Sequence, residues 1–114
     1  MIYNQGSLVL VPFPFTDLST TKKRPALVIS PDWFNQSYED VILAAVTSVV
    51  PASPRDLEVS LAQSDLSHGI IPRESVIKVT KLFTCHRDIV IREFARITRE
   101  KLSEVLGELR ALFS

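Results

Sequence analysis

Two short apolar runs joined by a basic loop constrain the fold of this chain more than any other feature. Residues 6–30 read GSLVLVPFPFTDLSTTKKRPALVIS. The first run, Ser7–Phe13, carries Leu and Val at successive positions, which indicates a strand covered on both faces. The second run, Ala26–Ile29, follows a basic loop over Pro14–Lys23. We therefore expect two strands whose connection gathers positive charge.

That loop leads into an arginine held by a proline. Lys22, Lys23 and Arg24 precede Pro25, and the proline ring restricts Arg24 to extended geometry at the strand entrance. A guanidinium fixed in this way matches the planar arrangement of phosphate oxygens. Three basic residues in a loop are, however, more often a solvated turn. The loop alone leaves both interpretations open.

Composition and charge limit the class of protein. A chain of 114 residues with 46% apolar residues predicts one folded domain over 1–114. The 13 basic and 13 acidic residues cancel, so phosphate binding must be local and not spread over the whole surface. No apolar run approaches the roughly 20 residues of a membrane span, and the N-terminus lacks the pattern of a signal peptide. We expect a cytoplasmic protein without a membrane partner.

Cysteine and histidine show no pattern of a metal site or a nucleophile. Cys85 is the single cysteine, which excludes an internal disulfide. His68 and His86 lack the spacing of metal ligands. His86 follows Cys85 directly, and neighbours on a strand point to opposite faces, so a Cys–His pair is not expected. The sequence predicts a structural cysteine and neither a metal nor a cofactor.

Further short runs, separated by proline and polar turns, predict a small antiparallel barrel. The expected strands cover residues 41–47, 57–61, 77–80 and 88–97. Residues 64–69 are polar and are expected to form a loop, with His68 as a turn residue. The predicted fold is therefore mainly β.

Two helices are expected beside these strands. The triplet Ser30-Pro31-Asp32 predicts a helix start with Ser30 as the cap. Trp33 is expected to pack against the barrel, with base stacking as the less favoured alternative. Apolar residues recur at helical spacing over 102–113 after Thr98, a predicted N-cap. Gly107 within that helix costs about 1 kcal/mol relative to alanine, which predicts a close backbone contact there.

The opening GSLVLVPFPFTDLS, the basic loop and RPALVIS resemble the PemK/MazF-like toxins, the ribonuclease halves of bacterial toxin–antitoxin pairs. In that family the Arg-Pro pair is coupled to a later strand that ends in Thr, often Thr-Ser. Here residues 41–46 are followed by Thr47-Ser48. The similarity continues through residues 75–113 and so covers nearly the whole chain. It implies an SH3-like antiparallel barrel with a C-terminal helix, assembled as a homodimer.

The resemblance also implies an activity, namely sequence-specific cleavage of single-stranded RNA by its own 2′-hydroxyl, without metal. Arg24 would stabilise the anionic phosphorane, and Thr47 would hold the scissile phosphate or the attacking hydroxyl in line. The other residues that would contact RNA are Thr16, Lys22, Lys23 and Ser48. A cognate antitoxin would silence the nuclease by occupying the same groove.

Two alternatives and two departures accompany this interpretation. The same barrel family includes inhibitors of DNA gyrase, which bind a protein and cut nothing, and a non-catalytic RNA-binding barrel is a third class. Arg24-Pro25 together with Thr47-Ser48 favours the nuclease. The loop lacks the glycine that many relatives carry there, and Ala95 stands where glycine is common in the last strand. The second departure questions local packing and not catalysis.

Overall fold

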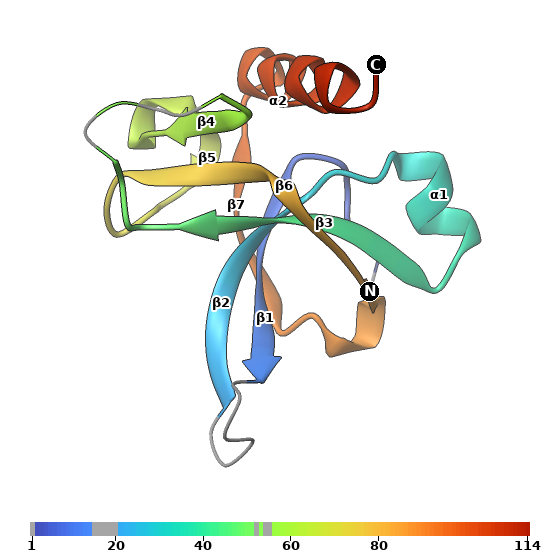
Figure 1. Cartoon of the computed structure of the whole chain (residues 1–114). Helices are drawn as coiled ribbons and strands as arrows, with labels where there is room; N and C mark the ends of the chain where they lie inside the picture. Colours follow the sequence, from blue (N-terminus) through green and yellow to red (C-terminus); the bar gives the residue numbers. More distant parts are fainter. Residues whose placement is uncertain (1, 15–20, 52, 54–55) are drawn as a thin grey trace.

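A curled, seven-stranded antiparallel sheet forms most of the molecule (Figure 1). The structure is a computed structural model, and it describes residues 2–14, 21–51, 53 and 56–114. Along the sheet the strands lie in the order β4-β6-β3-β2-β1-β7-β5. The strands are β1 (Ser7–Pro14), β2 (Thr21–Val28), β3 (Asp40–Thr47), β4 (Glu58–Leu61), β5 (Leu66–Gly69), β6 (Ser75–His86) and β7 (Arg92–Ile97).

The helical elements are α1 (Asp32–Ser37), α2 (Arg99–Leu112) and the 3-10 turns η1 (Gln63–Asp65) and η2 (Arg87–Ile89). The prediction of a mainly β fold with a C-terminal helix is confirmed. The sheet curls into a half-barrel whose edge strands are β4 and β5. None of the helices in the described part of the chain is long and apolar enough to cross a membrane.

Two boundary predictions were wrong for tertiary reasons. The expected polar loop over residues 64–69 contains β5, where Leu66 lies opposite Ile97 and His68 opposite Arg96 of β7. His68 is therefore a strand residue, paired with a segment about 30 positions away that its local sequence does not indicate. β2 begins at Thr21 because its early part pairs with the end of β1, so the basic residues that were expected in a loop lie on a strand.

Buried side chains form two clusters, one on each face of the sheet. The first lies beneath α2, whose Val105 is fully buried in it. The second lies beneath the N-terminal segment, with Tyr3 buried against it. The first cluster is Leu8, Leu27, Ile29, Ala44, Val46, Val59, Leu61, Ile71, Ile77, Val79, Ala95, Ile97 and Val105. The second is Tyr3, Val9, Val11, Ala26, Val28, Val41, Leu43 and Val90.

Helix α2 confirms its predicted start and corrects two predictions about its interior. Thr98 is the N-cap, and its hydroxyl accepts the Lys101 N–H at 3.1 Å. The apolar stripe packs on the first cluster as far as Leu112, but Phe113 is 74% exposed at the C-cap. The close contact expected at Gly107 is absent, since a Cβ added there would meet no described atom within 4 Å. Gly107 therefore lies on the solvent-facing side of the helix.

The predicted cap of α1 was also wrong. Pro31 occupies the N-cap position without a side-chain cap. The Ser30 hydroxyl instead donates to Asn35 Oδ1 at 2.5 Å and accepts the Ile42 N–H at 3.0 Å, so it joins α1 to β3. Trp33 does not pack against the sheet, because it is 64% exposed and meets Phe34 edge-on at 5.9 Å between ring centroids.

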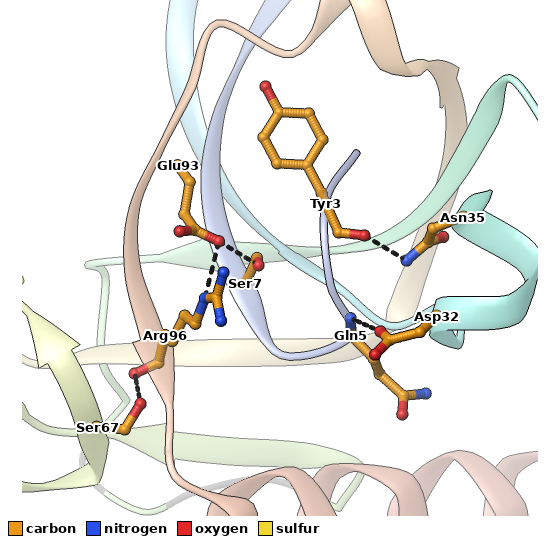
Figure 2. A network of polar contacts seen from close by, with 8 residues as sticks. All are labelled: Tyr3, Gln5, Ser7, Asp32, Asn35, Ser67, Glu93 and Arg96. Carbon is orange, nitrogen blue, oxygen red and sulfur yellow. Dashed lines mark hydrogen bonds and ion pairs between the residues drawn. The ribbon is translucent and has the colours of Figure 1, made fainter. Parts of the chain in front are cut away.

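Polar contacts secure the N-terminal segment against α1 and β7 (Figure 2). The Gln5 N–H donates to Asp32 Oδ1 at 2.8 Å, and Asn35 Nδ2 donates to the Tyr3 carbonyl at 3.0 Å. On β7, Glu93 accepts hydrogen bonds from the buried Ser7 hydroxyl and, at 3.2 Å, from Arg96 Nε. Burial and the nearby carboxylates of Glu93 and Asp88 raise the pKa of Tyr3. The bond between Ser7 and Glu93 joins β1 to β7.

Gly69 explains how the last strand accommodates Ala95 in place of the glycine common in that position. The two residues lie opposite each other in the β5–β7 ladder. Gly69 has φ +88, and a Cβ added to it would lie 2.4 Å from the Phe94 carbonyl oxygen and 2.7 Å from the Ala95 Cβ. The missing side chain of Gly69 therefore makes room for the methyl group of Ala95.

Candidate functional site

The pairing of β2 with β3 ends where the predicted catalytic residues begin. Paired residues run from Val28 opposite Leu43 to Ala26 opposite Ala45, and the ladder stops there. The next residue of β2 is Pro25, which has no N–H to donate. Continuing the same register by two residues places Arg24 beside Thr47. The sheet is thus open between β2 and β3 at the position of these two side chains.

A cavity of about 190 Å³, here called cavity A, lies on the α2 side of this opening. Its floor belongs to the first buried cluster, and its polar groups come from the ends of β2 and β3 and from the segment between β5 and β6. The lining residues are Leu8, Arg24, Pro25, Val46, Thr47, Ser48, Leu61, Ile71, Pro72, Arg73, Ser75 and Phe94.

A second cavity of about 250 Å³, cavity B, lies on the other side. It is lined by Arg24, Pro25, Ala45, Val46, Thr47, Lys78, Lys81 and Phe83. Lys78 lies directly opposite Ala45 in the β3–β6 ladder, and a register shift follows between Ala44 and Ala45. Arg24, Pro25, Val46 and Thr47 line both cavities, so they form the boundary between them.

Basic residues line both cavities, although the whole chain has no net charge. Arg24, Lys78 and Lys81 line cavity B, and Arg73 lines cavity A with Arg24. No Asp or Glu is among the residues that line either cavity in the described ranges. Lys78 of cavity B pairs with Glu58, whose Oε2 lies 3.9 Å from Lys78 Nζ. This distribution attracts an anion to the opening between β2 and β3.

Thr47 has a hydroxyl group that is hydrogen-bonded to the backbone two residues further along the chain. Its Oγ1 accepts the Val49 N–H at 3.1 Å, a bond that fixes the turn after β3. A hydroxyl is one donor and two acceptors, so the proton of Thr47 remains able to donate to an anionic oxygen. The pair at the boundary therefore combines a guanidinium group with a hydroxyl donor.

The other residues expected to contact RNA divide into three groups. Ser48 follows Thr47 and lines cavity A. Lys22 and Lys23 are exposed on β2, and side chains alternate along a strand, so Lys22 shares the face of Arg24 and Lys23 has the opposite face. Thr16 lies outside the described residues.

Several side chains of the site were missed from the sequence. Lys78 and Lys81 are far from Arg24 along the chain and reach cavity B through the β3–β6 ladder and its register shift. Phe83 and Phe94 read as ordinary apolar strand residues. A signal existed only for Lys78, which alternates with apolar residues in its strand and therefore had to face away from the first cluster.

Metal and thiol chemistry gain no support from the described side chains. Within the described ranges, no group of three or more His, Cys, Asp and Glu side chains is placed to hold a metal ion. Cys85 is half-buried, and burial together with the nearby Asp40 carboxylate raises its pKa. A raised pKa disfavours the thiolate, which agrees with a structural cysteine.

Comparison with known proteins gives this geometry a context. A model of the PemK-like, MazF-like toxins of type II toxin–antitoxin systems matches residues 4–113. The chain belongs to this toxin family. The resemblance seen in the sequence is thereby confirmed over nearly the whole chain. Comparison with curated protein sequences gave no match.

Solved structures with the same fold include toxins alone and toxins bound to antitoxins. A MazE–MazF complex from Deinococcus radiodurans is 25% identical, with a TM-score of 0.79 over 99% of this chain and 96% of that chain. An endoribonuclease in complex with its cognate antitoxin from a mycobacterial species is 14% identical, with a TM-score of 0.75 over 98% and 93%. The Mycobacterium tuberculosis toxin MazF-mt6 is 16% identical, with a TM-score of 0.72 over 94% and 95%. The two mycobacterial structures show a shared fold.

Proposed function

We propose that the chain is a toxin endoribonuclease that cuts single-stranded cellular RNA at defined sequences, without metal, and that a cognate antitoxin inhibits it. The observation that carries the proposal is that Arg24 and Thr47 line two cavities at once, and that every charged lining residue in the described part of the chain is basic. The family membership and the antitoxin complexes of its structural relatives support it. We further propose a homodimer that acts in the cytoplasm.

The reaction assigns one task to each of the two residues. The RNA 2′-oxygen loses its proton and forms a bond to phosphorus, the bond from phosphorus to the 5′-oxygen breaks, and that oxygen takes up a proton. The products are a 2′,3′-cyclic phosphate and a 5′-hydroxyl. Arg24 stabilises the extra negative charge of the phosphorane, and the Thr47 hydroxyl donates to a phosphoryl oxygen to hold it in line. The guanidinium group has five N–H donors and no acceptor, so the contribution of Arg24 is charge and positioning.

Purified protein should cut single-stranded RNA in the presence of a chelator, and one 2′-deoxy nucleotide at the cut should stop it. Arg24→Lys keeps the charge but loses the planar fork of donors, so the cleavage rate should fall by about a hundredfold or more. Thr47→Val keeps the shape and removes the hydroxyl, whereas Thr47→Ser is the matched control that retains it. Each rate is measured by single-turnover cleavage, with circular dichroism as the test of folding.

Three results would contradict the proposal. Cleavage of the 2′-deoxy substrate would exclude attack by the 2′-hydroxyl. Wild-type rates in folded Arg24→Lys and Thr47→Val proteins would remove both assigned roles. If wild-type protein leaves RNA intact and inhibits DNA gyrase instead, the chain belongs to the inhibitor class of the same fold.

A further inference from the structure

We propose that cavity A is the subsite that reads the nucleobase next to the cleaved bond. The inference rests on the proposed ribonuclease function and adds the source of its sequence preference. Unpaired bases of single-stranded RNA are recognised by stacking on apolar or aromatic surfaces and by hydrogen bonds at their edges. Cavity A offers both, and the proposed catalytic pair lies at its edge.

The shape of cavity A suits a single flat ring system. Pro25, Pro72 and Phe94 supply apolar walls, and the buried cluster supplies the floor. The volume of about 190 Å³ is smaller than the roughly 300 Å³ that marks the lower end for drug-sized ligands. A nucleobase fits this combination better than a whole nucleotide does, and the sugar and phosphate would stay outside at the opening.

The polar groups at its rim provide donors and acceptors for the edge of a base. Ser75 Oγ donates to the Arg73 carbonyl at 3.2 Å, which leaves its lone pairs to accept an N–H from a base. Arg73 and Ser48 line the same cavity and come from different segments of the chain, one after β5 and one after β3. A base inserted here would have one arginine and two serine residues as neighbours, which can distinguish one base edge from another by their donors and acceptors.

The segment that forms this rim is held in place before any ligand binds. The Gln63 side chain spans it, because its Nε2 donates to the Gly69 carbonyl at 3.0 Å and its Oε1 accepts the Ile71 N–H at 3.1 Å. Ile71 is itself buried in the first cluster. The wall next to Pro72 and Arg73 is thus preorganised, which lowers the entropy cost of binding a base.

The boundary residues place this subsite relative to the cut. Because Arg24 and Thr47 line both cavities, a phosphate bound by them has cavity A on one side and cavity B on the other. Lys78 and Lys81 in cavity B would hold the RNA backbone beyond the cut, an interaction that does not depend on sequence. Cavity A, with one Arg and two Ser at its rim, would discriminate between bases.

The test combines a substitution in cavity A with the removal of one base from the RNA. Wild-type protein first cuts a randomised RNA to define the preferred site, and the affinity for an uncleavable 2′-deoxy version of that site is then measured. An abasic nucleotide is placed on each flank of the cut in turn. In wild-type protein, one flank should lose about tenfold in affinity or more, which is the scale of one stacked base. In Phe94→Leu, the same abasic change should cost several-fold less than in wild type, because the aromatic stacking partner is gone while the polar groups of the rim remain.

Two further variants distinguish an effect on base recognition from a folding defect of the Phe94→Leu protein. Lys81→Ala in cavity B should weaken the binding of intact and abasic RNA equally and reduce the salt slope of log Kd by about one. Arg73→Met, on the exposed rim, should change the base selected next to the cut in the randomised RNA. The inference is supported by three results together. Phe94→Leu reduces the abasic penalty, Lys81→Ala does not change that penalty, and Arg73→Met changes the base preferred next to the cut.

The inference and the proposed function fail in different ways. If wild-type protein cuts no RNA, the proposed function fails and the subsite falls with it. If wild-type protein cuts normally but Phe94→Leu keeps the full abasic penalty and Arg73→Met keeps the same base preference, only the subsite is refuted. If these variants weaken the binding of an antitoxin peptide and leave the base preference unchanged, cavity A is a binding site for the antitoxin and the base-reading role is wrong.

Discussion

Replacing Gly69 by alanine tests the close approach of β5 to β7 next to the candidate site. Gly69 ends β5 opposite Ala95 and directly precedes the segment that carries Pro72 and Arg73. Its backbone has φ +88, a conformation that side chains with a Cβ rarely adopt. The added Cβ would lie 2.4 Å from the Phe94 carbonyl oxygen and 2.5 Å from the Ala95 Cα, which are backbone atoms that cannot rotate away.

Two costs add in Gly69→Ala. The left-handed backbone conformation costs about 1–2 kcal/mol for a residue with a Cβ. Forcing a methyl group into a filled space costs about 1–3 kcal/mol, because β5 must move away from β7. The free energy of unfolding should therefore fall by about 2–5 kcal/mol. For a chain of this size, the midpoint of thermal unfolding should fall by roughly 10–20 °C.

Gly107→Ala is the matched control within the same chain. It makes the same chemical change in an exposed part of α2 where no described atom lies within 4 Å of the new Cβ. It should stabilise the fold by about 0.5–1 kcal/mol through helix propensity. Both variants are compared with wild type by thermal and urea unfolding at equal protein concentration, because a dimer makes the midpoint concentration-dependent. A Gly69→Ala protein that melts within 2 °C of wild type, taken as about 0.5 kcal/mol, would show that β5 does not approach β7 as described.

Two further predictions concern charge. Lys22→Ala should reduce the salt slope of RNA binding by about one, whereas Lys23→Ala should leave it unchanged because its side chain lies on the opposite face of β2. The affinity for an uncleavable RNA is measured across a salt series for both variants. Equal effects would show that the alternation of side chains along β2 does not decide which lysine contacts RNA. The raised pKa of Cys85 means that the folded protein keeps a proton that the unfolded chain loses near pH 9, so this contribution to stability is present below about pH 9 and is lost as the pH rises further. Urea unfolding from pH 7 to pH 10 measures this contribution to stability, with Cys85→Ser as the variant that lacks the thiol. The raised pKa also predicts slow alkylation of the folded thiol at pH 8.

The sequence was sufficient for the parts of the site that depend on local pattern. Pro25 restricts the residue before it, and a β-branched run that ends in Thr47 places a hydroxyl at a strand end, so both members of the proposed catalytic pair could be named. The C-terminal helix and its Thr98 cap follow from periodicity and capping in the same way. These features need only residues close together in the chain.

The rest depends on pairing between distant segments. Lys81 and Phe83 reach cavity B only because the β3–β6 ladder shifts register, and a one-residue change of register reverses the face of every later side chain. Phe94 becomes a cavity wall only because β5 closes against β7. No periodicity within a single strand contains that information. The same reason accounts for His68, whose partner in β7 cannot be read from the residues around it.

The opening between β2 and β3 shows how a neutral protein can present a local anion site. A continuous ladder through Arg24 and Thr47 would bind their backbone groups in hydrogen bonds and close the passage between cavities A and B. Pro25 lacks the N–H that such a ladder requires, and the pairing ends one residue away at Ala26. The interruption allows Arg24 and Thr47 to line both cavities, with the positive side chains of β6 on one side and the rim of Arg73 on the other. Pro25 therefore has a role beyond orienting Arg24, since it interrupts the ladder at the position where the proposed reaction places the phosphate.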